Sequence, residues 1–212
     1  SKIKRKPLEK MGELTLPDMY AHCKALYSQR EPHNMPKPEH LSTTPTFFSL
    51  KDITQGLKKM ATRKVGDLQG FKSEMLKWAG KTAQEWICMM FNIALQHGMP
   101  YDWTTNWIKP LHKGGDTKEA SNYRTIMVGS IMAKLFGCVM EMKLSTWAES
   151  NNKRAHGQAG FRKSHSTIDH LVTLRVLMEE SRLAGKGLYC CFVDFRKAFD
   201  TVPWTNLWKR ME

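Results

Sequence analysis

The sequence predicts a mixed α+β fold, and three observations favour this class. Several segments repeat apolar residues at helical spacing. Two short apolar runs, at residues 107–111 and 125–128, lie on either side of a turn and predict a pair of strands. An apolar and aromatic run at residues 188–193 predicts a further strand. A chain of 212 residues can bury a core and is expected to form one or two domains.

An extended arm is expected at the start of the chain. Four of the nine prolines fall within residues 32–45, which indicates an arm or linker over residues 1–48. Within this arm, residues 14–28 can form a short helix. Helical spacing then begins at residue 50, with apolar side chains at Leu50, Ile53, Leu57 and Met60.

A stronger helix is expected to open at a capping box formed by Thr82 and Glu85. Gly98 followed by Pro100 is a helix stop. The apolar face of this helix is predicted to carry Trp86, Ile87, Met90, Ile93 and Ala94.

The second half of the chain is expected to begin with a hairpin-like pair of strands, residues 107–111 and 125–128, whose loop includes the turn at residues 112–116. A helix follows, with apolar residues at Ile131, Leu135, Val139 and Met142 and Trp147 closing the segment. Another helix is predicted from Ser166 to about Leu183, capped by Ser166 with Asp169 and stopped by Gly185 and Gly187. The strand Leu188–Val193 comes next and ends at Asp194.

The charge of the chain favours a polyanionic partner. The net charge is +13, and basic residues cluster within residues 2–10, 58–81 and 109–113. Such a footprint is typical of proteins that bind nucleic acid. A basic protein with no such partner, or one that meets a membrane surface, remains as an alternative. No apolar run approaches the roughly 18 to 20 residues of a membrane helix, so no membrane insertion is expected.

The cysteines favour a reducing, intracellular compartment. There are five, an odd number, and none forms a Cys-x-x-Cys pair. A disulfide framework or a zinc site is therefore not expected.

Asp194 is the candidate with the most specific surroundings. A single aspartate at a strand end is more often a cap or a salt-bridge partner than a metal ligand. Here, however, the run Asp194-Phe-Arg-Lys-Ala-Phe-Asp200 follows an apolar strand. The runs Asn122-Tyr-Arg124 and Gln158-Ala-Gly-Phe-Arg162 precede it in that order.

Together these motifs resemble the reverse transcriptases of non-LTR (LINE-type) retrotransposons and, more distantly, the group II intron enzymes. The resemblance covers most of the chain, from about Phe48 onward. Two positions depart from the family pattern. The segment Arg63-Lys-Val-Gly-Asp67 lacks the family's proline, and Thr125 stands where the family has proline.

The resemblance implies a truncated part of a polymerase: the fingers with the first strand of the palm. The expected organisation is a basic, proline-rich arm at 1–48, fingers at 49–187 and the start of the palm at 188–212. The implied activity is RNA-directed DNA synthesis by two Mg²⁺ ions. Asp194 would be the catalytic, metal-binding aspartate, and the backbone carbonyl of Phe195 would add an oxygen ligand. Because the family's later aspartates are absent from these 212 residues, the chain alone is expected to be inactive.

The resemblance also implies binding roles. Lys109 or Lys113, together with Arg124, would grip the triphosphate, and Phe199 would lie against the sugar 2′ position. A solvated loop lysine and a core aromatic are the alternatives for Lys113 and Phe199. The template strand would run along Gln158, Gly160, Phe161 and Arg162. The arm would follow the nucleic-acid backbone with four basic residues, Lys2, Lys4, Arg5 and Lys6.

The implied partners are an RNA template, a DNA primer and a protein that covers the truncated palm. The implied location of such an enzyme is the nucleus or the cytoplasm. The alternative is a repurposed, non-catalytic retrotransposon fragment that acts as a nucleic-acid-binding or structural subunit of a larger assembly.

Overall fold

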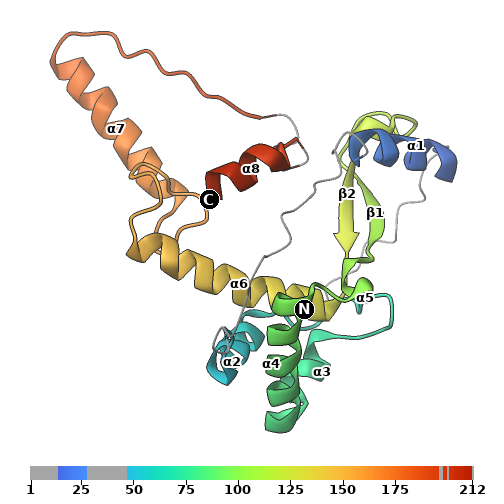
Figure 1. Ribbon diagram of the computed structural model, residues 1–212. Coiled ribbons are helices and arrows are strands. Elements are labelled where there is room, and N and C mark those ends of the chain that lie inside the picture. The colour runs from blue at the N-terminus through green and yellow to red at the C-terminus, as the bar shows by residue number, and fades with distance from the viewer. Residues whose placement is uncertain (1–13, 28–46, 196–197, 200, 212) are drawn as a thin grey trace, which may run out of the picture. The chain divides into compact units, whose positions relative to one another are not determined.

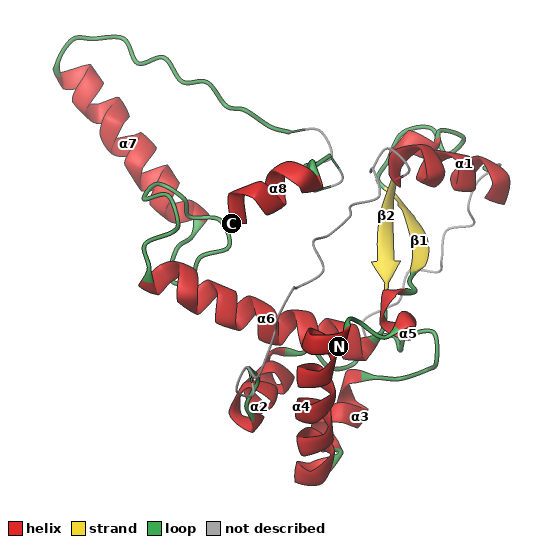
Figure 2. Ribbon diagram, viewed as in Figure 1, coloured by secondary structure: helices red, strands yellow, loops and turns green. Residues whose placement is uncertain are grey.

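The computed structural model describes residues 14–27, 47–195, 198–199 and 201–211. In these residues helices predominate and the sheet has two strands, so the fold is mixed α and β as predicted (Figures 1 and 2). The chain divides into two compact units, Ser1–Leu135 with Arg196–Glu212 and Phe136–Phe195. Helix α6, Ile131–Ser150, begins in the first unit and continues into the second.

Helices α2 (Leu50–Lys59), α3 (Ser73–Trp78) and α4 (Gly80–His97) pack together in the first unit. Phe48 and Phe91 are fully buried there, with ring centroids 6.0 Å apart. Trp103, in the short helix α5 (Tyr101–Thr104), lies edge-on to Phe91 at 5.6 Å. The Asn92 amide fixes the entry to α2, since it accepts from the Phe48 N–H at 2.9 Å and donates to the Phe48 carbonyl at 3.0 Å.

The start of α4 differs from the prediction. The capping box expected at Thr82 is wrong, because α4 begins at Gly80 and its N-cap makes no side-chain hydrogen bond. Gly80 has a φ of 82°, which glycine adopts easily, and this left-handed residue lets α4 follow α3 almost directly. Glu85 instead pairs with Lys81 at 3.9 Å. The predicted stop at Gly98 is confirmed.

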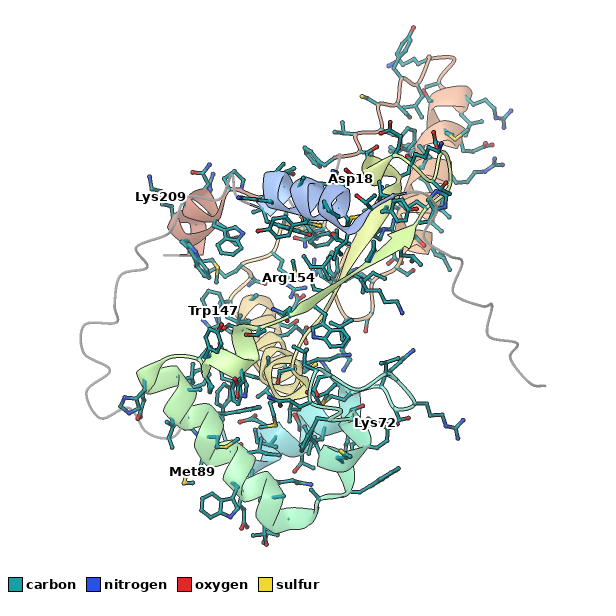
Figure 3. The ribbon with its side chains drawn as sticks, turned by 90° about the vertical axis from the view of Figure 1, so that its right-hand side faces the viewer. Asp18, Lys72, Met89, Trp147, Arg154 and Lys209 are labelled. Carbon is teal, nitrogen blue, oxygen red and sulfur yellow. The ribbon has the colours of Figure 1, made fainter. Side chains whose placement is uncertain are left out.

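The buried face of α4 is also rotated from the predicted one. Ile87 and Ala94 are buried as expected, but the centre of the stripe is Phe91. Trp86 and Ile93 are 61% and 48% exposed, because the helix turns these positions away from α2 and α3. Met90, also predicted on the buried face, is 39% exposed, and Met89, labelled in Figure 3, is 46% exposed.

Asp67 links the segment after α2 to the start of α6. Its carboxylate accepts hydrogen bonds from the N–H groups of Gln69, Phe71 and Ile131 at 3.1, 2.8 and 3.0 Å. Because a helix begins with unpaired N–H groups, the contact with Ile131 satisfies one of them. A side chain at Gly66 would stand only 2.9 Å from the Phe71 carbonyl oxygen, so this turn requires glycine.

The predicted hairpin is confirmed. Strand β1, Trp107–His112, pairs antiparallel with β2, Tyr123–Val128. The turn η1, Ala120–Asn122, leads into β2. Helix α1, Leu16–Tyr27, lies beside this hairpin (Figure 1), so the short helix expected at 14–28 forms as well.

The second unit contains most of α6, a loop and helix α7, Thr167–Leu183. The predicted capping box of Ser166 and Asp169 is present at the start of α7, and Gly185 follows its end with a φ of 63°. No residue of α7 is buried. Helix α8, Trp204–Met211, belongs to the first unit and was not predicted.

The strand predicted over Leu188–Val193 is wrong, because these residues have no regular secondary structure. Tyr189, Phe192 and Val193 are 96%, 84% and 75% exposed. A strand is stable only when neighbouring strands accept and donate its backbone hydrogen bonds. In the described part of the chain, the sheet consists of β1 and β2 alone, so this apolar run has no strand to pair with.

Some predictions are left open by the structure. Lys2, Lys4, Arg5 and Lys6 lie outside the described residues. The domain boundaries at 48 and 187 stay predictions. None of the described helices combines the length and the apolar character that crossing a membrane requires.

Candidate nucleic-acid interface

Helix α1 covers one face of the β1–β2 hairpin at its Tyr123 end, whereas Ile108 and Met127 on the same face are 40% and 52% exposed. Tyr123 is buried in a cluster with Leu14, Met19 and Cys23. The hydroxyl groups of Tyr27 and Thr125 are hydrogen-bonded at 2.8 Å. Tyr123 and Thr125 are two residues apart on β2 and therefore point to the same side of the sheet. In Figure 3, where Asp18 marks α1, the helix lies alongside the strands.

The opposite face of the hairpin is open. Lys109 pairs with Ile126, and Leu111 pairs with Arg124. Residues directly opposite each other in an antiparallel pair share a face, so these four side chains lie together. All four are exposed, and Trp107, two residues before Lys109, belongs to the same face. The sequence therefore places two cations among apolar side chains on one solvent-facing surface.

Within the described residues, neither Lys109 nor Arg124 on this open face has an acidic partner. They stand at diagonal positions of the ladder, which places their Cα atoms within about 8 Å of each other. Just beyond β1, the Lys113 N–H donates to the Asn122 carbonyl at 2.8 Å, and the Lys113 side chain is exposed. The three predicted triphosphate-binding residues thus belong to one hairpin.

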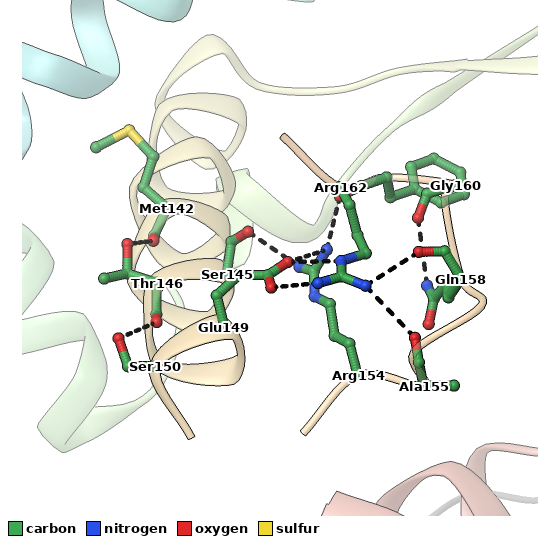
Figure 4. A network of polar contacts seen from close by, with 11 residues as sticks. Met142, Ser145, Thr146, Glu149, Ser150, Arg154, Ala155, Gln158, Gly160 and Arg162 are labelled. Atoms are coloured by element: carbon green, nitrogen blue, oxygen red, sulfur yellow. Dashed lines mark hydrogen bonds and ion pairs between the residues drawn. The ribbon is translucent and has the colours of Figure 1, made fainter. Parts of the chain in front are cut away.

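A second group of cations, in the second unit, is arranged differently (Figure 4). The Arg162 guanidinium donates to both carboxylate oxygens of Glu149, at 3.0 and 2.8 Å. It also donates to the carbonyls of Ala155 and Gln158 at 3.4 and 3.3 Å. Arg154 lies 3.5 Å from Glu149 and donates to the Ser145 hydroxyl at 2.9 Å. These guanidinium groups hold the loop after α6 onto that helix.

The pKa values reflect this pairing. The hydrogen bond from Arg162 is the main cause that lowers the pKa of the Glu149 carboxyl below its usual value, and the positive charges of Arg162 and Arg154 add to it. The same hydrogen bond raises the pKa of Arg162. Glu149 is therefore ionised whenever the ordinary glutamate would be, and the ion pair persists into mildly acidic solution.

Phe161 is the predicted template residue that the loop presents to solvent. Its side chain is 84% exposed, and its φ of 60° lies in the left-handed region, which is rare for a bulky residue. Arg154 donates to the Phe161 carbonyl at 2.8 Å and supports this conformation. Gln158 is exposed and donates to the Gly160 carbonyl at 3.3 Å. The predicted template role of all four residues, including the ion-paired Arg162, stays a prediction.

Asp194 and Phe195 are exposed at the end of the second unit. They offer one carboxylate and one backbone carbonyl, which are oxygen ligands of the kind that Mg²⁺ prefers. Mg²⁺ takes about six ligands, and no group of three or more acidic, histidine or cysteine side chains comes together in the described residues. These residues do not complete a metal site by themselves. Phe199, which belongs to the first unit, is 79% exposed.

Three features of the site were not predicted. Trp107 could have been found from strand alternation, because it lies two residues before Lys109. The Tyr27–Thr125 hydrogen bond joins residues 98 positions apart, and no local pattern reveals it. Glu149 lies 13 residues before Arg162, in a helix whose period does not mark it as a partner.

Comparison with known proteins agrees with the motifs. The family described as reverse transcriptase (RNA-dependent DNA polymerase) matches residues 111–212. A probable RNA-directed DNA polymerase from transposon X-element of Drosophila melanogaster is 30% identical over 162 residues, covering 74% of this chain and 18% of the relative. Its counterpart from transposon BS of the same species is 25% identical over 159 residues, covering 72% of this chain and 17% of the relative.

A third relative is the retrovirus-related Pol polyprotein from type-1 retrotransposable element R2 of Popillia japonica. It is 25% identical over 118 residues, which cover 56% of this chain and 16% of that protein. The chain thus spans less than a fifth of the length of these relatives. The family match and the named relatives agree with the resemblance drawn from the motifs. The chain belongs to the reverse transcriptases of non-LTR, LINE-type retrotransposons.

Proposed function

We propose that this chain supplies the nucleotide-gripping and template-contacting part of an RNA-directed DNA polymerase, which acts on an RNA template and a DNA primer. The open face of the β1–β2 hairpin carries this proposal, because Lys109 and Arg124 lie there at diagonal positions of the ladder without acidic partners among the described residues. A triphosphate needs several positive charges at close range, and this face offers them to solvent.

The two cations suit different parts of that task. The planar guanidinium of Arg124 can donate two parallel hydrogen bonds to one phosphate. The ammonium of Lys109 is a compact charge on a flexible stem and can follow a neighbouring phosphate. Lys113, at the end of the hairpin, extends the positive surface. Together they would hold the triphosphate and offset the charge that develops as the leaving group departs.

The loop after α6 would meet the template. The exposed ring of Phe161 can stack on a base, and Gln158 can donate to a base or phosphate beside it. In this proposal Arg162 acts mainly through its ion pair with Glu149, which keeps the loop in place. Gly160 keeps the backbone next to Phe161 free of a side chain.

Catalysis would need more than these residues. Reverse transcriptases in general use divalent metal ions, and we expect Mg²⁺ here, with Asp194 and the Phe195 carbonyl as two of its oxygen ligands. Further carboxylates must come from elsewhere, so the 212-residue chain alone is proposed not to polymerise. Phe199 would lie against the sugar 2′ position and disfavour ribonucleotides. A protein partner would cover the exposed run at Leu188–Val193.

The cellular setting is part of the proposal. All five cysteines are free thiols, which favours a reducing compartment, either nucleus or cytoplasm. A non-catalytic, nucleic-acid-binding subunit remains the competing function.

Primer extension on an RNA template with Mg²⁺ tests the proposal, with binding of the primer–template measured in the same samples. The chain is expected to bind the primer–template without extending the primer, and Lys109→Ala and Arg124→Ala are expected to weaken the binding of a deoxynucleoside triphosphate added to the same samples. Lys81→Ala is the control, because Lys81 is exposed on α4 and pairs with Glu85. Absence of binding contradicts the proposal.

Extension by the chain alone has a separate meaning. If it is lost in Asp194→Asn, the enzyme assignment stands and the proposed inactivity of the isolated chain is wrong. If binding persists but extension stays absent when a polypeptide carrying the remaining palm is added, the non-catalytic alternative is favoured.

A further inference from the structure

Two cysteines stand next to each other in the run that precedes Asp194. Cys190 and Cys191 are both exposed, in a loop that follows α7 (Figure 1). We propose that this pair is a redox-sensitive modification site: hydrogen peroxide joins the two thiols in a disulfide, and this disulfide keeps residues 188–193 from forming a β-strand. The inference rests on the proposed function, in which a partner covers this run and Asp194 binds the metal, and adds a means of control to it.

The surroundings of the five thiols favour this pair. Cys23 is buried, and Cys88 and Cys138 are half-buried. The Cys88 thiol donates to a backbone carbonyl at 3.2 Å, and burial raises its pKa, so it forms less of the reactive thiolate. Cys190 and Cys191 lie in exposed backbone, where peroxide reaches both sulfur atoms.

A disulfide between neighbouring residues is incompatible with a strand. Successive side chains of a strand point to opposite faces, so in a strand the sulfur atoms of Cys190 and Cys191 lie on opposite sides of the sheet and cannot bond. Within the described residues the run belongs to no sheet, so no ladder hydrogen bonds hold these two side chains apart. The dithiol form can therefore still join a sheet, whereas the disulfide form cannot.

Hydrogen peroxide balances the reaction. The thiolate of one cysteine attacks a peroxide oxygen, the O–O bond breaks, the sulfur becomes a sulfenic acid, and the departing hydroxide takes up a proton to give water. The sulfur of the second cysteine then attacks the sulfenic sulfur, the S–O bond breaks and a second water leaves. The two thiols together lose two electrons and two protons, and one hydrogen peroxide is reduced to two waters.

The disulfide is strained and therefore readily reversed. Neighbouring Cα atoms are about 3.8 Å apart, whereas most disulfides join Cα atoms about 4.4–6.8 Å apart. Strain makes a disulfide easier to reduce, so two glutathione thiols restore the dithiol and leave as oxidised glutathione. The dithiol is thus the resting state in a reducing compartment, and the disulfide forms only while peroxide is present.

Mass spectrometry of the tryptic peptide 187–196 tests the modification. The folded chain is treated with hydrogen peroxide, and its remaining thiols are then alkylated in denaturant. The expected product is this peptide lighter by two hydrogen atoms and without alkylation, which glutathione reverses, while the other three cysteines are alkylated. Cys190→Ser is the matched control, because it keeps one exposed thiol and cannot form the bridge. Oxidation of each sulfur without a bridge, or earlier loss of the other three thiols, overturns the proposal.

Binding to a polypeptide that carries the remaining palm tests the consequence. The oxidised chain is expected to bind about tenfold or more weakly than the reduced chain, because the hydrogen bonds of the strand are lost. The double variant Cys190→Ser, Cys191→Ser is expected to bind equally before and after peroxide. Equal affinity of the oxidised and reduced chains overturns the switch and leaves the proposed function standing. If the reduced chain does not bind at all, the proposed palm role and the switch fail together.

Discussion

Two pairs of cations in this chain have the same charge and different surroundings. Lys109 and Arg124 stand on an open hairpin face, without acidic partners among the described residues. Arg154 and Arg162 stand beside Glu149, and their side chains are only 18% and 16% exposed. The first pair is available to a ligand, whereas the second donates its hydrogen bonds to α6 and to the loop that follows it. A basic residue in a sequence motif can therefore serve either purpose, and its acidic neighbours decide which.

The largest expected effect is on binding. Replacing both Lys109 and Arg124 by alanine should lower the affinity for a fluorescent deoxynucleoside triphosphate on the order of a hundredfold or more, since each hydrogen bond to a charged group contributes about 1.5–3 kcal/mol. The melting temperature should stay the same, because the structure gives these side chains no ion pair within the described residues. Fluorescence anisotropy and a thermal melt of the same sample provide both values. A large drop in melting temperature would show that Lys109 and Arg124 support the fold, as Arg154 and Arg162 do, and would contradict the difference drawn between the two pairs.

Arg162→Ala should leave ligand affinity unchanged and loosen the fold locally. Loss of the contacts with Glu149, Ala155 and Gln158 should loosen residues 154–162, with amide hydrogen exchange there severalfold faster. Arg182→Ala is the control, because Arg182 pairs with Glu179 at 2.6 Å on an exposed surface, where ion pairs contribute little. Equal effects of the two substitutions would mean that the Glu149 network does not hold the loop.

Tyr27→Phe tests the closed face of the hairpin. It removes the hydroxyl that is bonded to Thr125 at 2.8 Å, and a part-buried hydrogen bond of this kind contributes about 0.5–1.5 kcal/mol. The expected result is faster hydrogen exchange of the β2 amides with little change in the exchange of α4. Unchanged β2 exchange would show that α1 does not stabilise the hairpin through this contact.

The smallest expected effect is a pH dependence. The pKa of Glu149 is lowered in the folded protein, so the unfolded chain binds its proton more readily. The ion pair therefore contributes stability above the ordinary glutamate pKa of 4.5, and that contribution is lost as the pH falls through the lower folded pKa. Glu149→Gln should be less stable than the unaltered chain at neutral pH, and the difference should shrink on acidification. Thermal melts at several pH values measure it.

Local signals in the sequence predicted the fold where neighbours along the chain supply the contacts. The capping box at Ser166 starts α7, and the two runs of the hairpin pair because the loop at residues 113–122 joins them directly. The run at 188–193 is also apolar and aromatic, but it has no partner strand in the described residues, and propensity alone does not form a strand. The capping box predicted at Thr82 fails for a similar reason. Helix α4 already begins at Gly80, whose φ is left-handed, so Thr82 lies inside the helix and does not cap it.

In the candidate site, too, local patterns predicted part of the arrangement and tertiary contacts determine the rest. Motif resemblance selected Lys109 and Arg124, and strand alternation suffices to place them on one face. It also selected Arg162, but only the structure reveals Glu149 as its partner, because a tertiary contact decides between ligand binding and support of the loop. Thr125 stands where the family has proline. Its hydroxyl is hydrogen-bonded to the Tyr27 hydroxyl, a contact that proline could not make, and this contact explains the threonine.

The most direct measurement is the salt dependence of the binding of a deoxynucleoside triphosphate, from about 50 to about 200 mM salt. Salt screens the attraction between exposed cations and phosphates. The double substitution of Lys109 and Arg124 by alanine is therefore expected to reduce the slope of log affinity against log salt, whereas Arg162→Ala should leave it unchanged. A slope that falls for Arg162→Ala and stays the same for the hairpin variant would contradict the assignment of the open face as the triphosphate site.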